Sequence, residues 1–130
     1  MLHKKFALVL MFAAGTILLG TGCYKDKTVA VDAPVITRTV SFSQDIIPIF
    51  NSSCNGSGCH TTGGQTPNLS AATAYNSLTT GNYLNVDAPD KSLIYLKLTG
   101  QKGTVMPVSG SNKDYNALIL AWITQGAKNN

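Results

Sequence analysis

Two cysteines, one histidine and one methionine are the side chains of this sequence with the most chemistry to offer. Cys54 and Cys59 are separated by four residues, His60 follows the second cysteine directly, and Met106 lies in a later segment rich in glycine and serine. Thiolate, imidazole and thioether groups are all ligands of soft or borderline metals. These four residues therefore form the candidate site.

A cysteine followed directly by a histidine is typical of chains that carry covalently attached haem. Two thiols add across the vinyl groups of the porphyrin, and the histidine beside the second thioether then reaches the iron. Cys54 and Cys59 would carry one haem in this interpretation, with His60 as the proximal ligand. A thioether suits the opposite axial position, and the only other histidine of the chain is His3. Met106 is therefore predicted to be the distal ligand.

A disulfide between Cys54 and Cys59 is the alternative, because an oxidising compartment permits one. It would make the domain a non-redox structural or binding module, and it leaves the positions of His60 and Met106 without a reason. A zinc site would have two thiolates and one imidazole, and it would need an aspartate such as Asp87 or Asp90 as its fourth ligand. The pattern favours haem over both.

The spacing of the two cysteines needs a physical account. The usual attachment pattern has two residues between them, whereas four separate Cys54 from Cys59. Residues five apart lie about 140° from each other on a regular helix, so a helix would not present both thiols to one group. Gly56 and Gly58 tolerate positive φ angles. We expect them to loop the extra residues outward and to return Cys54 toward the haem.

The expected function follows from the axial ligands. With His60 and Met106 both bound, the iron keeps no open position for a substrate. We therefore expect an electron carrier rather than an enzyme, with redox proteins as partners and no small-molecule substrate. The chain contains no glutamate, so a peroxidase would lack a carboxylate of that kind to move protons beside the iron.

Residues 1–22 have the pattern of a secretory signal. A positively charged start precedes an apolar run over 6–19 that is shorter than the ~20 residues of a membrane span. Small residues then come directly before Cys23. This resembles a bacterial lipoprotein signal, although an aliphatic residue is usual at the position of Gly20. We expect lipid on Cys23 and an exported, membrane-anchored protein of the cell envelope, on the periplasmic or outer-membrane side. An ordinary cleaved signal and an uncleaved anchor are the alternatives.

Charge is sparse in this chain. The formal net charge is +4, only 12% of the residues are charged, and no run of basic residues occurs. Nucleic-acid binding is therefore not expected. Lys91, Lys97 and Lys102 are interpreted first as solvated surface residues and second as a border of the haem edge that steers an acidic partner.

The remaining chain is expected to consist of a tether and one domain. Residues 23–41 read as a flexible tether, and residues 42–130 as an all-α domain of about four short helices. The first helix is expected to begin after Ser43 as its N-cap, and to start late or bend at Pro48, which has no N–H to donate.

Three further helices are expected along the domain. Ser70 is predicted to cap the second, which ends at Gly81. The third covers residues 91–98. Ser111 is predicted to begin the fourth, with Gly126 as its C-terminal cap and an apolar stripe at helical spacing between them.

From about Phe42 to Ala127 the chain resembles the small bacterial class I c-type cytochrome domains, especially those described as planctomycete-type. The resemblance rests on five segments in matching order and spacing: Asp45-Ile46-Ile47-Pro48-Ile49-Phe50, Cys59-His60, Pro89-Asp90-Lys91-Ser92-Leu93-Ile94, Met106-Pro107, and Trp122-Ile123 with Gly126-Ala127.

The resemblance implies a cytochrome c-like fold around one covalent haem c. By that likeness four residues hold the haem: Cys54 and Cys59 through thioethers, and His60 and Met106 through the iron. The carbonyl of Pro67 is expected to accept the proton of the proximal imidazole. The first and last helices are expected to cross near the haem, which would place Phe50 against Leu118 or Trp122.

Overall fold

The computed structural model describes residues 33–130. The expected signal segment, Cys23 and the first part of the expected tether lie outside the described residues. Within residues 33–130 all regular elements are helical and no strand is formed. The all-α prediction is confirmed for this part of the chain.

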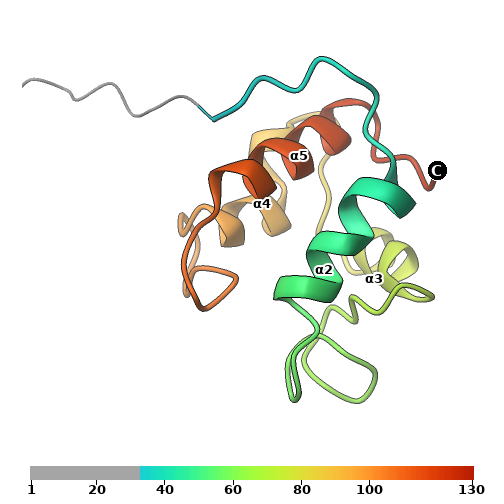
Figure 1. Ribbon diagram of the computed structural model, residues 1–130, viewed down its shortest axis with the longest axis vertical. Helices are drawn as coiled ribbons and strands as arrows, with labels where there is room; N and C mark the ends of the chain where they lie inside the picture. Colours follow the sequence, from blue (N-terminus) through green and yellow to red (C-terminus); the bar gives the residue numbers. More distant parts are fainter. Residues whose placement is uncertain (1–32) are drawn as a thin grey trace, which may run out of the picture. The chain divides into compact units, whose positions relative to one another are not determined.

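Six helical elements follow one another within residues 33–130, and Figure 1 labels α2 to α5 among them. They are the π-helical turn η1 (Phe42–Ile46), the helices α2 (Ile47–Ser53) and α3 (Ala74–Thr80), the 3₁₀ turn η2 (Pro89–Lys91), and the helices α4 (Leu93–Leu98) and α5 (Lys113–Thr124). Long irregular segments separate α2 from α3 and α4 from α5, and these two segments carry the candidate site.

The first helix begins earlier than predicted. Its N-cap is Ser41, whose Oγ accepts the N–H of Gln44 at 3.2 Å, so the prediction of Ser43 was wrong. The N–H of Ile46 donates to the carbonyl of Ser41, five residues back, at 3.3 Å. This π pairing changes to α pairing directly before Pro48, which lies in the first turn of α2. The predicted irregularity at the proline is thus a change of helix type.

Two other caps also differ from the predictions. The side chain of Ser70 does not cap α3; instead its carbonyl accepts the N–H groups of Thr73 and Ala74 in a preceding turn, and the helix starts four residues later than Ser70. Helix α5 is capped by Asn112 rather than Ser111. The Oδ1 atom of Asn112 accepts the N–H of Asp114 at 3.0 Å and of Tyr115 at 3.1 Å, which satisfies two donors of the first turn.

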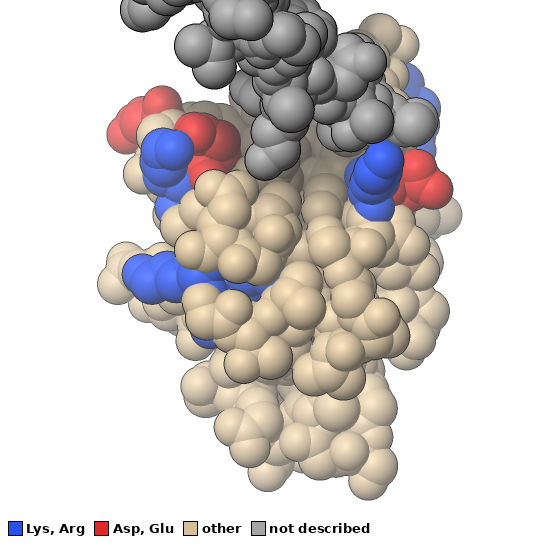
Figure 2. Space-filling view, turned by 90° about the vertical axis from the view of Figure 1, so that its left-hand side faces the viewer, with Lys and Arg blue, Asp and Glu red and all other residues tan. Residues whose placement is uncertain are grey.

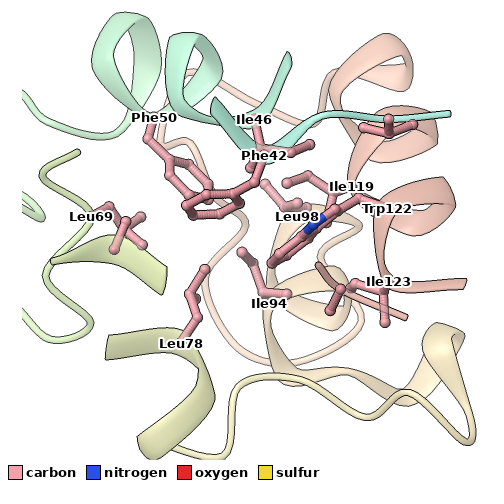
Figure 3. Packing of buried hydrophobic residues seen from close by; sticks show 13 residues of the cluster. Phe42, Ile46, Phe50, Leu69, Leu78, Ile94, Leu98, Ile119, Trp122 and Ile123 are labelled. Carbon is pink, nitrogen blue, oxygen red and sulfur yellow. The ribbon is translucent and has the colours of Figure 1, made fainter. Parts of the chain in front are cut away.

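The aromatic centre of the core joins the first helix to the last (Figure 3). The ring of Phe42 lies 5.0 Å from that of Trp122 and 6.3 Å from that of Phe50, measured between centroids. Phe42 on η1 therefore makes the ring contact with Trp122, which was one of the two contacts predicted for Phe50. Buried Ile119 and Ile123 flank the indole on α5, as the apolar stripe predicted.

Side chains near the C-terminal end fix the start of the first helix. The amide of Gln125 accepts the N–H of Val40 at 2.8 Å and donates to the carbonyl of Arg38 at 3.0 Å. The Oδ1 atom of Asn130 accepts the N–H of Phe42 at 2.9 Å. Figure 1 shows the C-terminal end beside the beginning of η1. These bonds hold the helix that leads into Cys54.

Candidate functional site

One cavity brings together all four residues of the candidate site. It has a volume of about 370 Å³, is partly open to solvent, and is lined by Cys54, Cys59, His60 and Met106 among others. Sites for small molecules and cofactors usually have volumes of ~300–1,000 Å³. Residues from two distant segments of the chain therefore face one space of suitable size.

The walls of this cavity are mainly apolar. They come from α2, from α4, from the two long irregular segments and from the connection between α3 and η2. They include Phe50, Leu69, Tyr83, Ile94, Leu98 and Pro107. Several of these residues also belong to the packed core, so the cavity borders the core directly. Such walls exclude water and lower the local dielectric constant, which suits a large hydrophobic group.

The extra residues between the cysteines form a closed loop. The N–H of Cys54 still donates to the carbonyl of Phe50 at 2.9 Å, and the N–H of His60 donates to the carbonyl of Cys54 at 3.1 Å. These hydrogen bonds keep the two ends of the loop close together. Gly58 has φ +75°, as predicted. A positive φ at Gly56 is not found; its carbonyl instead accepts the N–H of Cys59 at 2.9 Å.

The imidazole of His60 is held by the backbone of Pro67. Its Nδ1 lies 3.0 Å from the carbonyl oxygen of that residue, so the contact expected from the resemblance is confirmed. A carbonyl can only accept a hydrogen bond, and Nδ1 must therefore carry the proton. The lone pair of the neutral ring is then on Nε2, the atom that remains available to bind a metal.

A tight turn after His60 supports this arrangement. The N–H of Gln65 donates to the carbonyl of Cys59, and the N–H of Leu69 to the carbonyl of His60, both at 2.7 Å. A Cβ atom on Gly64 would lie 2.0 Å from the carbonyl oxygen of Cys59. Glycine is therefore required at position 64. In the sequence, the pair Gly63-Gly64 was the one sign of this requirement.

The two cysteines differ in their surroundings. Both are free thiols in the structure; Cys54 is half-buried and Cys59 is exposed. Burial, and to a smaller extent the neighbouring Cys59, raises the pKa of Cys54 to about 11. Its sulfur is therefore protonated at neutral pH and packs as a small apolar group on the cavity wall.

Met106 reaches the cavity from the other irregular segment. Its N–H donates to the carbonyl of Lys97 at 2.9 Å, which ties the segment to the end of α4. Pro107 beside it is buried and lines the same cavity. The thioether thus faces the space that His60 also lines, from a separate part of the chain.

The donor atoms fit a haem better than a single ion. No group of three or more histidine, cysteine, aspartate or glutamate side chains able to hold an ion occurs within residues 33–130. Asp87 and Asp90 do not line the cavity. A zinc site needs its ligands around one point. A haem instead takes thioethers at its edge and ligands on two opposite faces, within apolar walls.

A long stretch of the chain carries no charged side chain. From Ile46 to Val86 the sequence contains no aspartate, glutamate, lysine or arginine. Figure 2 shows this as a face whose lower part is free of charged side chains. The sequence interpreted Lys97 first as a solvated surface residue and second as a border of the haem edge; in the structure Lys97 is half-buried and lines the cavity.

Comparison with protein-family models, with curated proteins and with solved structures finds no match for this chain. None of the helices between residues 33 and 130 is long and apolar enough to cross a membrane.

Proposed function

We propose that residues 42–130 form a small c-type cytochrome domain that carries one covalent haem c and transfers electrons. The observation that supports this most is the convergence on one apolar cavity of two thiols, an oriented imidazole and a thioether. Each of these groups is common in proteins, but haem attachment uses all four together.

Each residue has a distinct role in this proposal. Cys54 and Cys59 hold the haem through thioethers, His60 binds the iron through Nε2, and Met106 binds it through its sulfur. The carbonyl of Pro67 keeps the proton on Nδ1 and so keeps the ring in one orientation. When bound, haem supplies an iron that changes between the ferric and ferrous states.

The surroundings of the site adjust that redox change. A thioether opposite an imidazole stabilises the reduced iron relative to harder ligands. The apolar walls exclude water, which also disfavours the more highly charged ferric state. With His60 and Met106 as ligands, no position remains for a substrate, so the domain is proposed to be an electron carrier rather than an enzyme.

The location belongs to the same proposal. A lipid on Cys23 would anchor the protein to a membrane of the cell envelope, with redox proteins as its partners. Covalent haem attachment and export fit together, because an exported thioether-bound cofactor cannot be lost by dissociation.

The proposal is tested by producing the protein together with cytochrome c maturation enzymes. The expected product is red, keeps its colour in the polypeptide after extraction with acidic acetone, and is reduced and reoxidised reversibly. A known c-type cytochrome expressed in parallel controls for maturation. A colourless product beside a red control would contradict the proposal and favour the alternative, a non-redox module with a Cys54–Cys59 disulfide.

A further inference from the structure

Among residues 33–130, Lys97 is the only lysine, arginine, aspartate or glutamate that lines the cavity. The other lining residues within the described part of the chain are apolar or uncharged at neutral pH apart from the titratable cysteines and His60. Lys97 lies on α4 between Leu96 and Leu98, and it is half-buried. A cation in an otherwise apolar wall is costly unless an anion compensates it.

Lys97 adjoins the segment that carries Met106 both through its backbone and through its side chain. Its backbone carbonyl accepts the N–H of Met106 at 2.9 Å. At its other end, a Cβ atom on Gly103 would lie only 2.9 Å from Nζ, and Gly103 has φ +69°. The ammonium group thus occupies the space that a side chain at position 103 would fill.

No carboxylate of the described residues pairs with this ammonium group. Two other basic side chains of the described residues do form ion pairs, Arg38 with Asp45 and Lys91 with Asp90. Lys97 therefore differs from Lys91, whose charge is already compensated by its neighbour.

We propose that Lys97 binds a carboxylate group of the molecule that fills the cavity. This inference rests on the proposed function, in which that molecule is haem and the carboxylates are its propionates. The propionates bring negative charge to an apolar cavity, and a single lysine on its wall is the group that can compensate it. Charges attract more strongly there than in water, since the walls exclude solvent.

The test compares Lys97→Gln with Lys102→Gln in the matured haem protein. Both variants remove one positive charge, but Lys102 is exposed and does not line the cavity. Loss of a positive charge near the haem favours the ferric state, so Lys97→Gln is expected to shift the midpoint potential in the negative direction by more than Lys102→Gln does. Lys97→Arg keeps the positive charge and is expected to have a midpoint potential close to that of the parent protein.

Infrared difference spectra between the two redox states provide the specific readout. In protein whose haem is isotope-labelled at its carboxyl carbons, the labelled bands are expected to shift in Lys97→Gln and to stay in place in Lys102→Gln. Labelled bands that do not move in Lys97→Gln would overturn this inference while leaving the proposed function intact. Absence of haem from all variants and from the parent protein would instead overturn the proposed function.

Discussion

The proton on His60 decides what this imidazole can bind. The carbonyl of Pro67 accepts a hydrogen bond from the Nδ1–H group, so the lone pair is on Nε2, which is the atom that can bind a metal. The residue type and position of His60 identified it as a ligand. Its contact with Pro67 was predicted only from the family resemblance, because a turn of the backbone brings the imidazole and the carbonyl together. The sequence likewise identified Met106 from its residue type and surroundings, whereas Lys97 and Gly64 depend on distances across the fold.

Met106→Ala tests the distal ligand. A methionine bound to ferric haem gives a weak sulfur-to-iron charge-transfer band in the far red, so the variant is expected to lose that band completely and to have a more negative midpoint potential. Val108→Ala is the control, because Val108 lies two residues away, is 77% exposed and has no donor atom. A far-red band that persists in Met106→Ala would exclude Met106 as the ligand.

Gly64→Ala tests the turn that supports His60. The new Cβ would lie 2.0 Å from the carbonyl oxygen of Cys59, and backbone must move to relieve it. We expect a loss of about 2 kcal/mol or more in the free energy of unfolding, within the usual range for overpacking. In Gly63→Ala nothing lies within 4 Å of the new atom and only the positive φ is strained, at a cost of about 1 kcal/mol. Equal denaturation midpoints for the two matured variants would contradict this account.

At the scale of elements, the start of the first helix depends on a salt bridge as well as on its cap. Arg38 contacts Asp45 with two hydrogen bonds of 2.7 Å, and the same carboxylate accepts the N–H of Ser41 at 2.8 Å. The hydrogen bond from the guanidinium lowers the pKa of Asp45 below its ordinary value of 3.8. The carboxylate therefore binds protons less tightly in the folded chain than in the unfolded one.

Asp45→Asn is expected to lower the melting temperature by a few degrees at pH 7. Since the folded pKa lies below the unfolded one, the stabilisation is complete above pH ~4 and is lost as the pH falls through the folded pKa. The difference in melting temperature between Asp45→Asn and the parent protein should therefore become smaller at acidic pH. Asp90→Asn removes a more exposed ion pair and is expected to have little effect. Identical melting curves for Asp45→Asn and the parent at pH 7 would refute the role of this pair.

The existence of the helices was predicted better than their ends. The apolar stripe of α5 and the glycines that end α4 and α5, with φ +72° and +93°, followed from periodicity and backbone preference. Gly81 ends α3 as predicted, but the three predicted N-caps, Ser43, Ser70 and Ser111, were misplaced, because serine, threonine and asparagine cluster near these helix starts. Which of them caps depends on local backbone geometry rather than on residue type alone.

The distribution of charge is a property of the whole described domain. Residues 33–130 contain six basic and four acidic side chains, and none lies between Ile46 and Val86. The loop with both cysteines belongs to this uncharged stretch, and Figure 2 shows the corresponding part of the surface free of charge. Electrostatic steering toward the cavity is therefore expected to be weak.

Electron exchange with a multiply charged metal complex is expected to depend little on salt. Between low ionic strength and about 0.5 M, the second-order rate constant should change by less than about threefold, because few charges near the cavity remain to be screened. Stopped-flow absorbance measures this rate, with a lysine-rich c-type cytochrome as control. A change of more than about tenfold would indicate that charged residues such as Lys97 and Lys102 direct the encounter.

The most direct test of the central claim is peptide mass spectrometry of protein matured in the presence of haem-attachment enzymes. The account predicts that the peptide containing both Cys54 and Cys59 carries the added mass of one haem and has no free thiol. A peptide without tetrapyrrole mass, and with its two sulfurs joined only to each other, would contradict it.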